Sequence, residues 1–355
     1  ESTQILRPET ATLMHSRQFG LSPELNGMCL GFYEESRNGQ RIIGHGGDTV
    51  YFHSDMHLML ENGVGFFVSY NSAGKGEISP RTALWQHFLD RYFPYTPPKV
   101  EKPSTADADA RAVAGHYLTS RRSESNFLKV AAVDDNVQVT PDENGTIKIE
   151  PFKDFNGQIK KWQEVGPLVY RSVNGQDRVA FRRTNQGGMQ MVPNFPAVAF
   201  QRVKLVANSD FNQSIIGAAL AIMALTLICW PLAAIVRSHY HQRLELDAAY
   251  MRLRPWVRLV CAVNIAFLIL FFLTISSNSI TALSSRNDLK FHVVQALGVL
   301  GAAGILVVVL AAFHSWSDSH VWFWTKVWNL LLLLASIAFV WFSFHWNLLN
   351  FNLNY

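Results

Sequence analysis

The segment from Ile43 to Ser54, IGHGGDTVYFHS, holds the densest group of side chains able to do chemistry. Its His45-Gly46-Gly47-Asp48 stretch places a hydrogen-bonding ring beside two glycines, which let a substrate or another backbone come close to a strand. Exposed backbone N–H groups next to a polar side chain suit acyl transfer, because such donors stabilise the oxyanion formed when an ester or amide is attacked. We therefore predict that His45, Gly46, Gly47 and the backbone N–H of Asp48 form one side of an active site.

Three histidines in this region, His45, His53 and His57, raise the alternative of a metal site. On a strand, His53 and His57 share a face but lie about 13 Å apart at roughly 3.3 Å per residue, which is too far for one ion without a bend. No Cys or Glu-x-x-His pattern supports them. We expect neither a metal nor another cofactor.

Strand-like runs separated by turn dipeptides must position these residues. The turns are Asn38-Gly39 and Asn62-Gly63, and the predicted strands span Met28 to Glu34, Arg41 to Gly46, Tyr51 to Leu60 and Val64 to Tyr70. Short helices are predicted before them, over Pro8 to Gln18, and after them, over Ser79 to Phe93, where Ser79 is the expected N-cap and Pro80 the expected first helical residue. The order predicts an antiparallel sheet with a covering helix.

These residues resemble the C-terminal end of the catalytic domain in serine β-lactamase-related hydrolases, a group of class C β-lactamases, D-Ala-D-Ala carboxypeptidases and esterases. The resemblance covers about residues 5 to 95 and rests on Leu30-Gly31-Phe32, Gly44-His45-Gly46-Gly47, Phe52-His53-Ser54, the run from Gly63 to Val68, and Asn71. In that family a Lys-Thr-Gly or His-x-Gly motif lines the active site. The resemblance implies that His45 contacts the substrate or the catalytic tyrosine, that Gly47 keeps the strand clear, and that the Asp48 N–H donates to the oxyanion.

The family's nucleophile lies in a Ser-x-x-Lys motif far upstream of the His-x-Gly motif. This chain has no Ser-x-x-Lys motif before His45. Ser72-Ala73-Gly74-Lys75 and Tyr70-Asn71-Ser72 match the family's other motifs in residue type only, since they follow the His-x-Gly position and overlap each other. We interpret both as coincidental. Because the chain opens with Glu1 inside a helical pattern, we expect the nucleophile on an N-terminal part that is missing, and expect this chain to be inactive alone.

The leading hypothesis for the parent protein is a membrane-anchored serine hydrolase that cleaves a small peptide, amide or ester substrate through an acyl-enzyme. A non-catalytic membrane receptor or scaffold, using the hydrolase-like fold for binding, stays open as the alternative. A transporter is disfavoured, because the four long apolar runs after residue 210 contain no charged residue near their centres. Asn264 is a polar residue within one of these runs.

Composition and periodicity divide the rest of the chain. Residues 96–110 are rich in Pro and acidic side chains and predict a linker, and residues 111–205 alternate short strands with turns at a spacing of roughly 10 residues, typical of a small all-β domain. Residues 211–346 predict four transmembrane helices, each long enough for a bilayer core of roughly 30 Å. Their ranges are about 214–236, 257–275, 293–313 and 327–346, followed by a tail over 347–355. The predicted fold class is mixed: the C-terminal part of an α+β β-lactamase-like domain over residues 1–95, the β domain, and the transmembrane bundle.

The basic charge belongs to the membrane part, which holds 8 Lys/Arg and 4 Asp/Glu in a chain of net charge +4. No basic cluster interleaved with aromatic residues occurs before residue 210, so we exclude nucleic acid as a partner. Positive residues stay on the cytoplasmic side, and most lie in the first loop. This predicts a multi-pass protein of the inner membrane with residues 1–210 on the periplasmic or extracellular side. The loop residues are Arg237, Arg243, Arg252, Arg254 and Arg258.

Small residues within the third run predict close helix packing. Gly298, Gly301 and Gly304 recur every third residue and offer a surface that another helix can approach. That helix could belong to the same chain or to a second copy. The predicted partners are therefore the lipid bilayer and, through these helices, possible self-association.

Overall fold

The computed structural model describes residues 5–75, 78–135, 137–242, 246, 248–276 and 283–354. The chain forms two compact units, which are described separately. The first, here the sheet–barrel unit, comprises Glu1–Arg121 and Asp135–Lys204, and the second, the helical unit, comprises Arg122–Asp134 and Leu205–Tyr355. Arg243, which the predicted orientation uses, lies outside the described residues.

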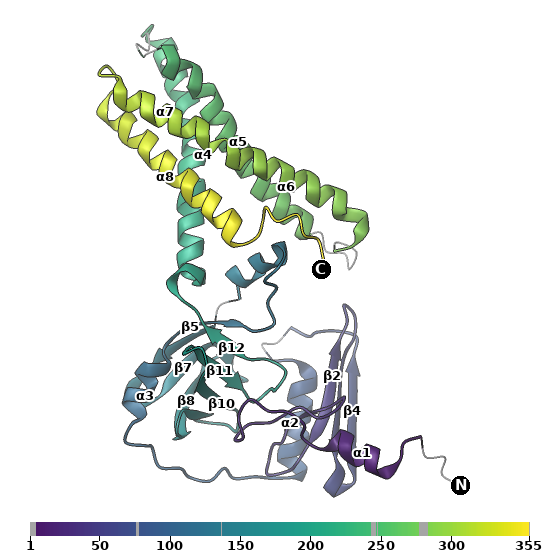
Figure 1. The fold of residues 1–355 in the computed structure, drawn as a ribbon. Coiled ribbons are helices and arrows are strands. Elements are labelled where there is room, and N and C mark those ends of the chain that lie inside the picture. Colours follow the sequence, from purple (N-terminus) through teal and green to yellow (C-terminus); the bar gives the residue numbers. More distant parts are fainter. Residues whose placement is uncertain are drawn as a thin grey trace. The chain divides into compact units, whose positions relative to one another are not determined.

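A four-stranded antiparallel sheet opens the sheet–barrel unit (Figure 1). Its strands lie side by side in chain order: β1 (Tyr33–Glu34), β2 (Ile43–Asp48), β3 (His53–Met59) and β4 (Val64–Tyr70). Gly63 allows the tight β3–β4 connection because its φ is 64°, in the left-handed region that favours glycine. The sheet matches the predicted order, but β1 is much shorter than the run predicted from Met28, since Gly31 turns the chain with φ 75°.

Two helices accompany this sheet. Helix α1 (Pro8–His15) ends before the predicted Gln18 because Ser16 is extended, and it buries no residue. Helix α2 (Pro80–Tyr92) begins with the predicted proline and turns Trp85 and Leu89 inward. These two side chains form a small core with Ile42 and Met59 of the sheet region, so α2 fixes one face of the sheet.

A closed eight-stranded barrel forms the rest of this unit. Its core packs Tyr117, Phe181 and Trp162 together, and helix α3 (Ala106–Val113) adds Ala110 and Val113 to it. Helix α3 therefore starts inside the stretch predicted as a linker. The strands are β5 (Gly115–Thr119), β6 (Val137–Pro141), β7 (Ile147–Lys153), β8 (Ile159–Gly166), β9 (Val169–Ser172), β10 (Arg178–Arg183), β11 (Met189–Pro193) and β12 (Phe200–Arg202).

Within the described residues, the helical unit contains four helical stretches long and apolar enough to cross a membrane, in agreement with the four predicted spans. They are α4 (Ser209–His239), α5 (Ala248–Ile275), the stretch Ser285–Ser317 that holds α6 (Asp288–Ala303) and α7 (Ile305–Ser317), and α8 (Phe323–His345). The three predicted glycines face α5 of the same chain, where a Cβ would collide with Phe267 from Gly298, Asn264 from Gly301 and Val260 from Gly304.

One segment between two barrel strands belongs to the helical unit. It contains a 3-10 helix, η2 (Phe127–Val133), whose Phe127 is fully buried. The Phe127 ring packs against Phe271 of α5 and Phe291 of α6, with centroid distances of 5.7 and 4.8 Å. The preceding Asn126 donates a hydrogen bond from Nδ2 to the carbonyl of Asn354 at 2.6 Å. Nothing in the sequence pattern indicated this assignment.

Candidate functional site

The predicted site occupies one edge of β2. Strand β1 pairs with β2 only through Tyr33–Gly44 and Glu34–Ile43, so no described strand pairs with the last four residues of β2 on that edge. In an antiparallel ladder, successive N–H groups point alternately to the two sides. The Gly46 N–H donates to the Tyr33 hydroxyl on the β1 side. By alternation, the N–H of Asp48 points to the same edge, away from β3.

The side-chain positions of His45 and Gly47 lie on the face of the sheet opposite α2. In the register with β3, His45 faces Met56 and Gly47 faces Ser54. Both β2 residues are exposed, and a Cβ at Gly47 would meet nothing within 4 Å. The structure therefore places an exposed imidazole, an open glycine and an edge N–H within residues 45 to 48 of β2. Whether they act in catalysis stays a prediction.

Tyr33 is a further neighbour of this edge, which no motif in the sequence indicated. Its ring lies 5.4 Å from that of His45 and 5.1 Å from that of Phe195, measured between centroids. Burial raises the pKa of its hydroxyl, which the N–H of Gly46 partly offsets. This hydroxyl therefore stays protonated at neutral pH and can donate a hydrogen bond near the edge.

Arg81 of α2 holds the end of the β2–β3 hairpin. Its guanidinium contacts the carboxylates of Asp48 at 2.9 Å and Asp55 at 3.1 Å, and donates to the carbonyls of Gly47 and Ser54. The carboxylate of Asp48 also lies 2.6 Å from the ring of His53. Arg81, and next His53, lowers the pKa of the Asp48 carboxyl. These contacts fix the backbone that carries the Asp48 N–H.

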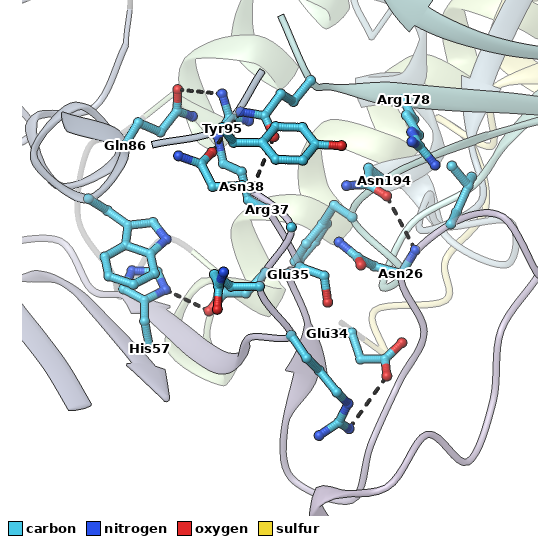
Figure 2. A pocket seen from close by; sticks show the side chains of 18 of the residues that line it. Asn26, Glu34, Glu35, Arg37, Asn38, His57, Gln86, Tyr95, Arg178 and Asn194 are labelled. Carbon is cyan, nitrogen blue, oxygen red and sulfur yellow. Dashed lines mark hydrogen bonds and ion pairs between the residues drawn. The ribbon is translucent and has the colours of Figure 1, made fainter. Parts of the chain in front are cut away.

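A cavity of about 690 Å³ lies beside this edge, within the sheet–barrel unit (Figure 2). Its walls are joined by direct contacts: Arg37 pairs with Asp177 at 2.9 Å, and the N–H of Asn26 donates to Asn194 at 3.2 Å. Five arginines and four acidic residues line it, so its wall is strongly polar. They are Arg17, Arg37, Arg41, Arg171, Arg178, Glu24, Glu34, Glu35 and Asp55.

The most buried ionisable pair in this wall is Glu35 with His57. Their Oε1 and Nδ1 atoms lie 2.6 Å apart, and the side chain of His57 is 5% exposed. The ring of His57 stacks on Trp85, while its Nε2 has no hydrogen-bond partner among the described residues. Burial raises the pKa of the Glu35 carboxyl, and the hydrogen bond from His57 offsets part of that rise. This pair can hold or move a proton at the cavity wall.

The cavity and the β2 edge share neighbours. Asp55 lines the cavity and faces Gly46 across the β2–β3 ladder. Phe195 also lines the cavity and packs on Tyr33, whose hydroxyl accepts the Gly46 N–H. Burial raises the pKa of the Asp55 carboxyl, which Arg81 opposes. Asp55 and Phe195 therefore connect the cavity to the predicted site, although none of residues 45 to 48 lines the cavity itself.

The remaining sequence candidates lie apart from this region. Ser72 accepts a hydrogen bond from the N–H of Gly74 in the turn after β4, which is no helix. Across the ranges that the structure describes, no group of three or more His, Cys, Asp and Glu side chains could hold a metal ion. His45 is on the opposite face of the sheet from His53 and His57.

Comparison with known proteins gives weak likenesses only. No family model matches the chain, and no curated protein matches it. A solved structure described as SurE with D-Leu aligns with 56% of this chain and 44% of its own, at 16% identity and a TM-score of 0.32. A structure described as SurE aligns with 56% and 42%, at 15% identity and a TM-score of 0.31. The chain thus spans less than half the length of these neighbours, and likeness at this level carries no argument about function.

The predicted family resemblance needs correction. No family model matches the chain, and the two solved structures above are described as SurE, not as a β-lactamase, carboxypeptidase or esterase, so the assignment to serine β-lactamase-related hydrolases is not upheld. The structure also ends the sheet–barrel unit in a closed eight-stranded barrel. A short His-x-Gly match arises easily by chance, since it constrains only two positions. The assignment is withdrawn.

Proposed function

We propose that this chain is part of a multi-pass membrane hydrolase in which the free edge of β2 binds the oxyanion during cleavage of an ester, amide or peptide bond. The proposal rests on the Asp48 N–H. Because successive N–H groups alternate, this N–H points outward from the unpaired edge of β2, away from β3. Beside it, Gly47 leaves room for a substrate because nothing lies within 4 Å of its Cβ position. Such an N–H donor is the element that acyl transfer needs.

Two side chains support the same reaction. The exposed imidazole of His45 and the hydroxyl of Tyr33 lie close together at this edge, with ring centroids 5.4 Å apart. Either group can hydrogen-bond a substrate carbonyl or its leaving group. The attacking nucleophile is not assigned to any residue of this chain. The proposal includes the predicted orientation, with residues 1–210 on the periplasmic or extracellular side of the inner membrane.

The test separates the Asp48 N–H from its carboxylate. Asp48→Pro removes both, whereas Asp48→Ala removes only the carboxylate and serves as the matched control. The protein from its complete gene, in lipid nanodiscs, is assayed with p-nitrophenyl acetate and labelled with a fluorophosphonate. We expect Asp48→Pro to have a kcat about 10² to 10³ lower than that of Asp48→Ala. Equal kcat values, or wild-type protein that neither turns over nor becomes labelled, would refute the proposal.

A second candidate function is a non-catalytic membrane receptor, favoured by the cavity. Its volume of about 690 Å³ lies within the roughly 300 to 1,000 Å³ typical of small-molecule sites. Arg178 at the cavity wall forms no ion pair with any described residue, so it can bind a ligand carboxylate. Here Arg178→Ala should abolish a thermal shift caused by small carboxylates or peptides, and Arg183→Ala, an exposed change on the same strand, should preserve it. A shift unaffected by Arg178→Ala, or none at all, counts against this function.

A further inference from the structure

Three arginines gather where α4 ends and α5 begins. Arg237 lies in the last turn of α4, and Arg254 and Arg258 lie in the first turns of α5. Because α4 and α5 are joined by a short connection, these parts of the two helices lie at the same end of the helical unit (Figure 1). All three arginines are half-buried. Half-buried arginines at a helix end need a partner, because a charge near an apolar span is costly when it is unpaired.

Arg254 lies over the rings of Trp230 and Tyr250, here called the aromatic shelf. Its guanidinium carbon is 4.5 Å from the centre of the Trp230 ring and 5.9 Å from that of Tyr250. Trp230 belongs to α4, and Tyr250 to α5, where it is fully buried. Stacking of a guanidinium on aromatic faces holds it in one orientation and leaves its edge N–H groups available.

The shelf is held by α8 as well. The amide Nδ2 of Asn329 donates to the Tyr250 hydroxyl at 2.6 Å. One turn before Trp230, the hydroxyl of Thr226 accepts a hydrogen bond from the indole of Trp328 at 2.9 Å. The Tyr250 ring and the turn of α4 before Trp230 are thus each hydrogen-bonded to a third helix, which holds the two rings under Arg254 in place.

The described residues supply no anion for these cations. Among the residues that the structure describes, which do not include Glu245 and Asp247 between the two helices, no carboxylate forms an ion pair with Arg237, Arg254 or Arg258. The positive charges of Arg237 and Arg258 also act unfavourably on Arg254. Arg254, which stacks on aromatic rings and is repelled by two neighbouring cations, therefore forms a site that favours an anion.

The depth of the cluster suits the phosphate layer of a bilayer. Arg254 comes six residues after the start of α5 at Ala248, about 9 Å along the axis at roughly 1.5 Å per residue. Tryptophan side chains such as Trp230 favour the interface between headgroups and acyl chains. We therefore expect a guanidinium stacked on that ring to lie at the depth of the lipid phosphates.

We propose that Arg237, Arg254 and Arg258 bind the phosphate of an anionic phospholipid headgroup, with Trp230 and Tyr250 as the apolar floor of the site. The acyl chains continue along the apolar surface of α4 and α5. Guanidinium groups match phosphate through paired N–H donors, which gives the site its preference for phosphate over other headgroup atoms. The site is independent of the β2 edge.

The test measures lipid retention by native mass spectrometry. The full chain is purified in detergent and titrated with phosphatidylglycerol or phosphatidylcholine. We expect wild type to retain phosphatidylglycerol preferentially, and each of Arg254→Gln, Arg237→Gln and Arg258→Gln to weaken that binding about fivefold. Arg252→Gln is the matched control, since it removes the same charge from an exposed position of the same helix and should bind as wild type does.

Three results would overturn the proposal. Equal loss in Arg252→Gln and Arg254→Gln would mean that net charge alone attracts the lipid. Equal retention of both lipids by wild type would mean that the site has no preference for an anionic headgroup. Complete displacement of the lipid by inorganic phosphate at equal concentration would identify a free anion as the ligand. Helix content by circular dichroism verifies that each variant folds, and Arg254→Lys, which keeps the charge, provides a second folded variant with reduced selectivity.

Discussion

The imidazole of His57 lies flat on the indole of Trp85, with ring centroids 4.1 Å apart and an angle of 2° between the planes. This stack joins β3 to α2. A hydrogen bond between His57 and Glu35, the residue directly after β1, adds a third segment to the contact. Three segments far apart in sequence therefore meet at one wall of the cavity. The stability of the sheet and the shape of the cavity both depend on this contact.

Truncation of Trp85 should destabilise the sheet more than truncation elsewhere on α2. Trp85→Ala removes the stack and a buried core side chain, so we expect a loss of about 3 to 5 kcal/mol. Leu84→Ala, at a neighbouring position that is 44% exposed, should cost less than about 1 kcal/mol. Hydrogen exchange of the β3 and β4 amides measures both. Similar protection in the two variants would show that the stack contributes little.

The Glu35 carboxyl should make stability depend on pH. Its pKa in the folded protein is raised above the ordinary value of 4.5, mainly by burial, so the folded state favours the protonated acid. The stability that this contributes is present below pH 4.5 and is lost as the pH rises through the folded pKa. The glutamine in Glu35→Gln is neutral at every pH, so the stability of this variant should not fall in this way as the pH rises. Unfolding midpoints of wild type and variant from pH 4.5 to 8 test it, and parallel profiles would contradict it.

Two glycines of β2 should respond in opposite ways to the same substitution. A Cβ at Gly44 would collide with the Glu35 carboxylate and the carbonyl of Met56, whereas a Cβ at Gly47 meets nothing within 4 Å. We expect Gly44→Ala to cost about 1 to 3 kcal/mol through this overpacking, and Gly47→Ala to stay within about 0.5 kcal/mol of wild type. Thermal unfolding of the two variants side by side tests this, and an equal loss would show that the Glu35 side chain moves freely.

Phe127 should hold the segment between β5 and β6 in the helical unit. Phe127→Ala removes a fully buried ring that packs against Phe271 and Phe291, which costs about 3 to 5 kcal/mol in a soluble core. We expect trypsin to cleave after Lys129 faster in this variant. Phe155→Ala removes the same ring from a position that is 51% exposed and is the control. Unchanged cleavage in Phe127→Ala would place the anchoring contact elsewhere.

Much of the local structure follows from the sequence alone. Four uninterrupted apolar runs predicted four membrane-crossing helices, because the length of a run without charge is a local property that the bilayer thickness alone selects. The strand alternation around Asn62-Gly63 likewise predicted the β3–β4 hairpin, and Pro80 marked the start of α2. His45 and Gly46 were likewise expected on one strand, but the predicted strand ended at Gly46, whereas β2 continues through Gly47 to Asp48. The family resemblance failed because it rested on a short motif, which carries little information about the packing around it.

Only the tertiary structure decided which of these elements meet. No periodicity in the sequence brings Glu35 to His57 and Trp85, closes the barrel by pairing β12 with β5, or assigns Phe127 to the helical unit. The same holds for Arg254 over Trp230, which depends on how α4 packs against α5. Hydrophobic patterns and turn residues determine the backbone conformation and the buried face of each element. The partner of that face is set by long-range packing, where the free energy depends on the shape and charge of every surface that competes for it.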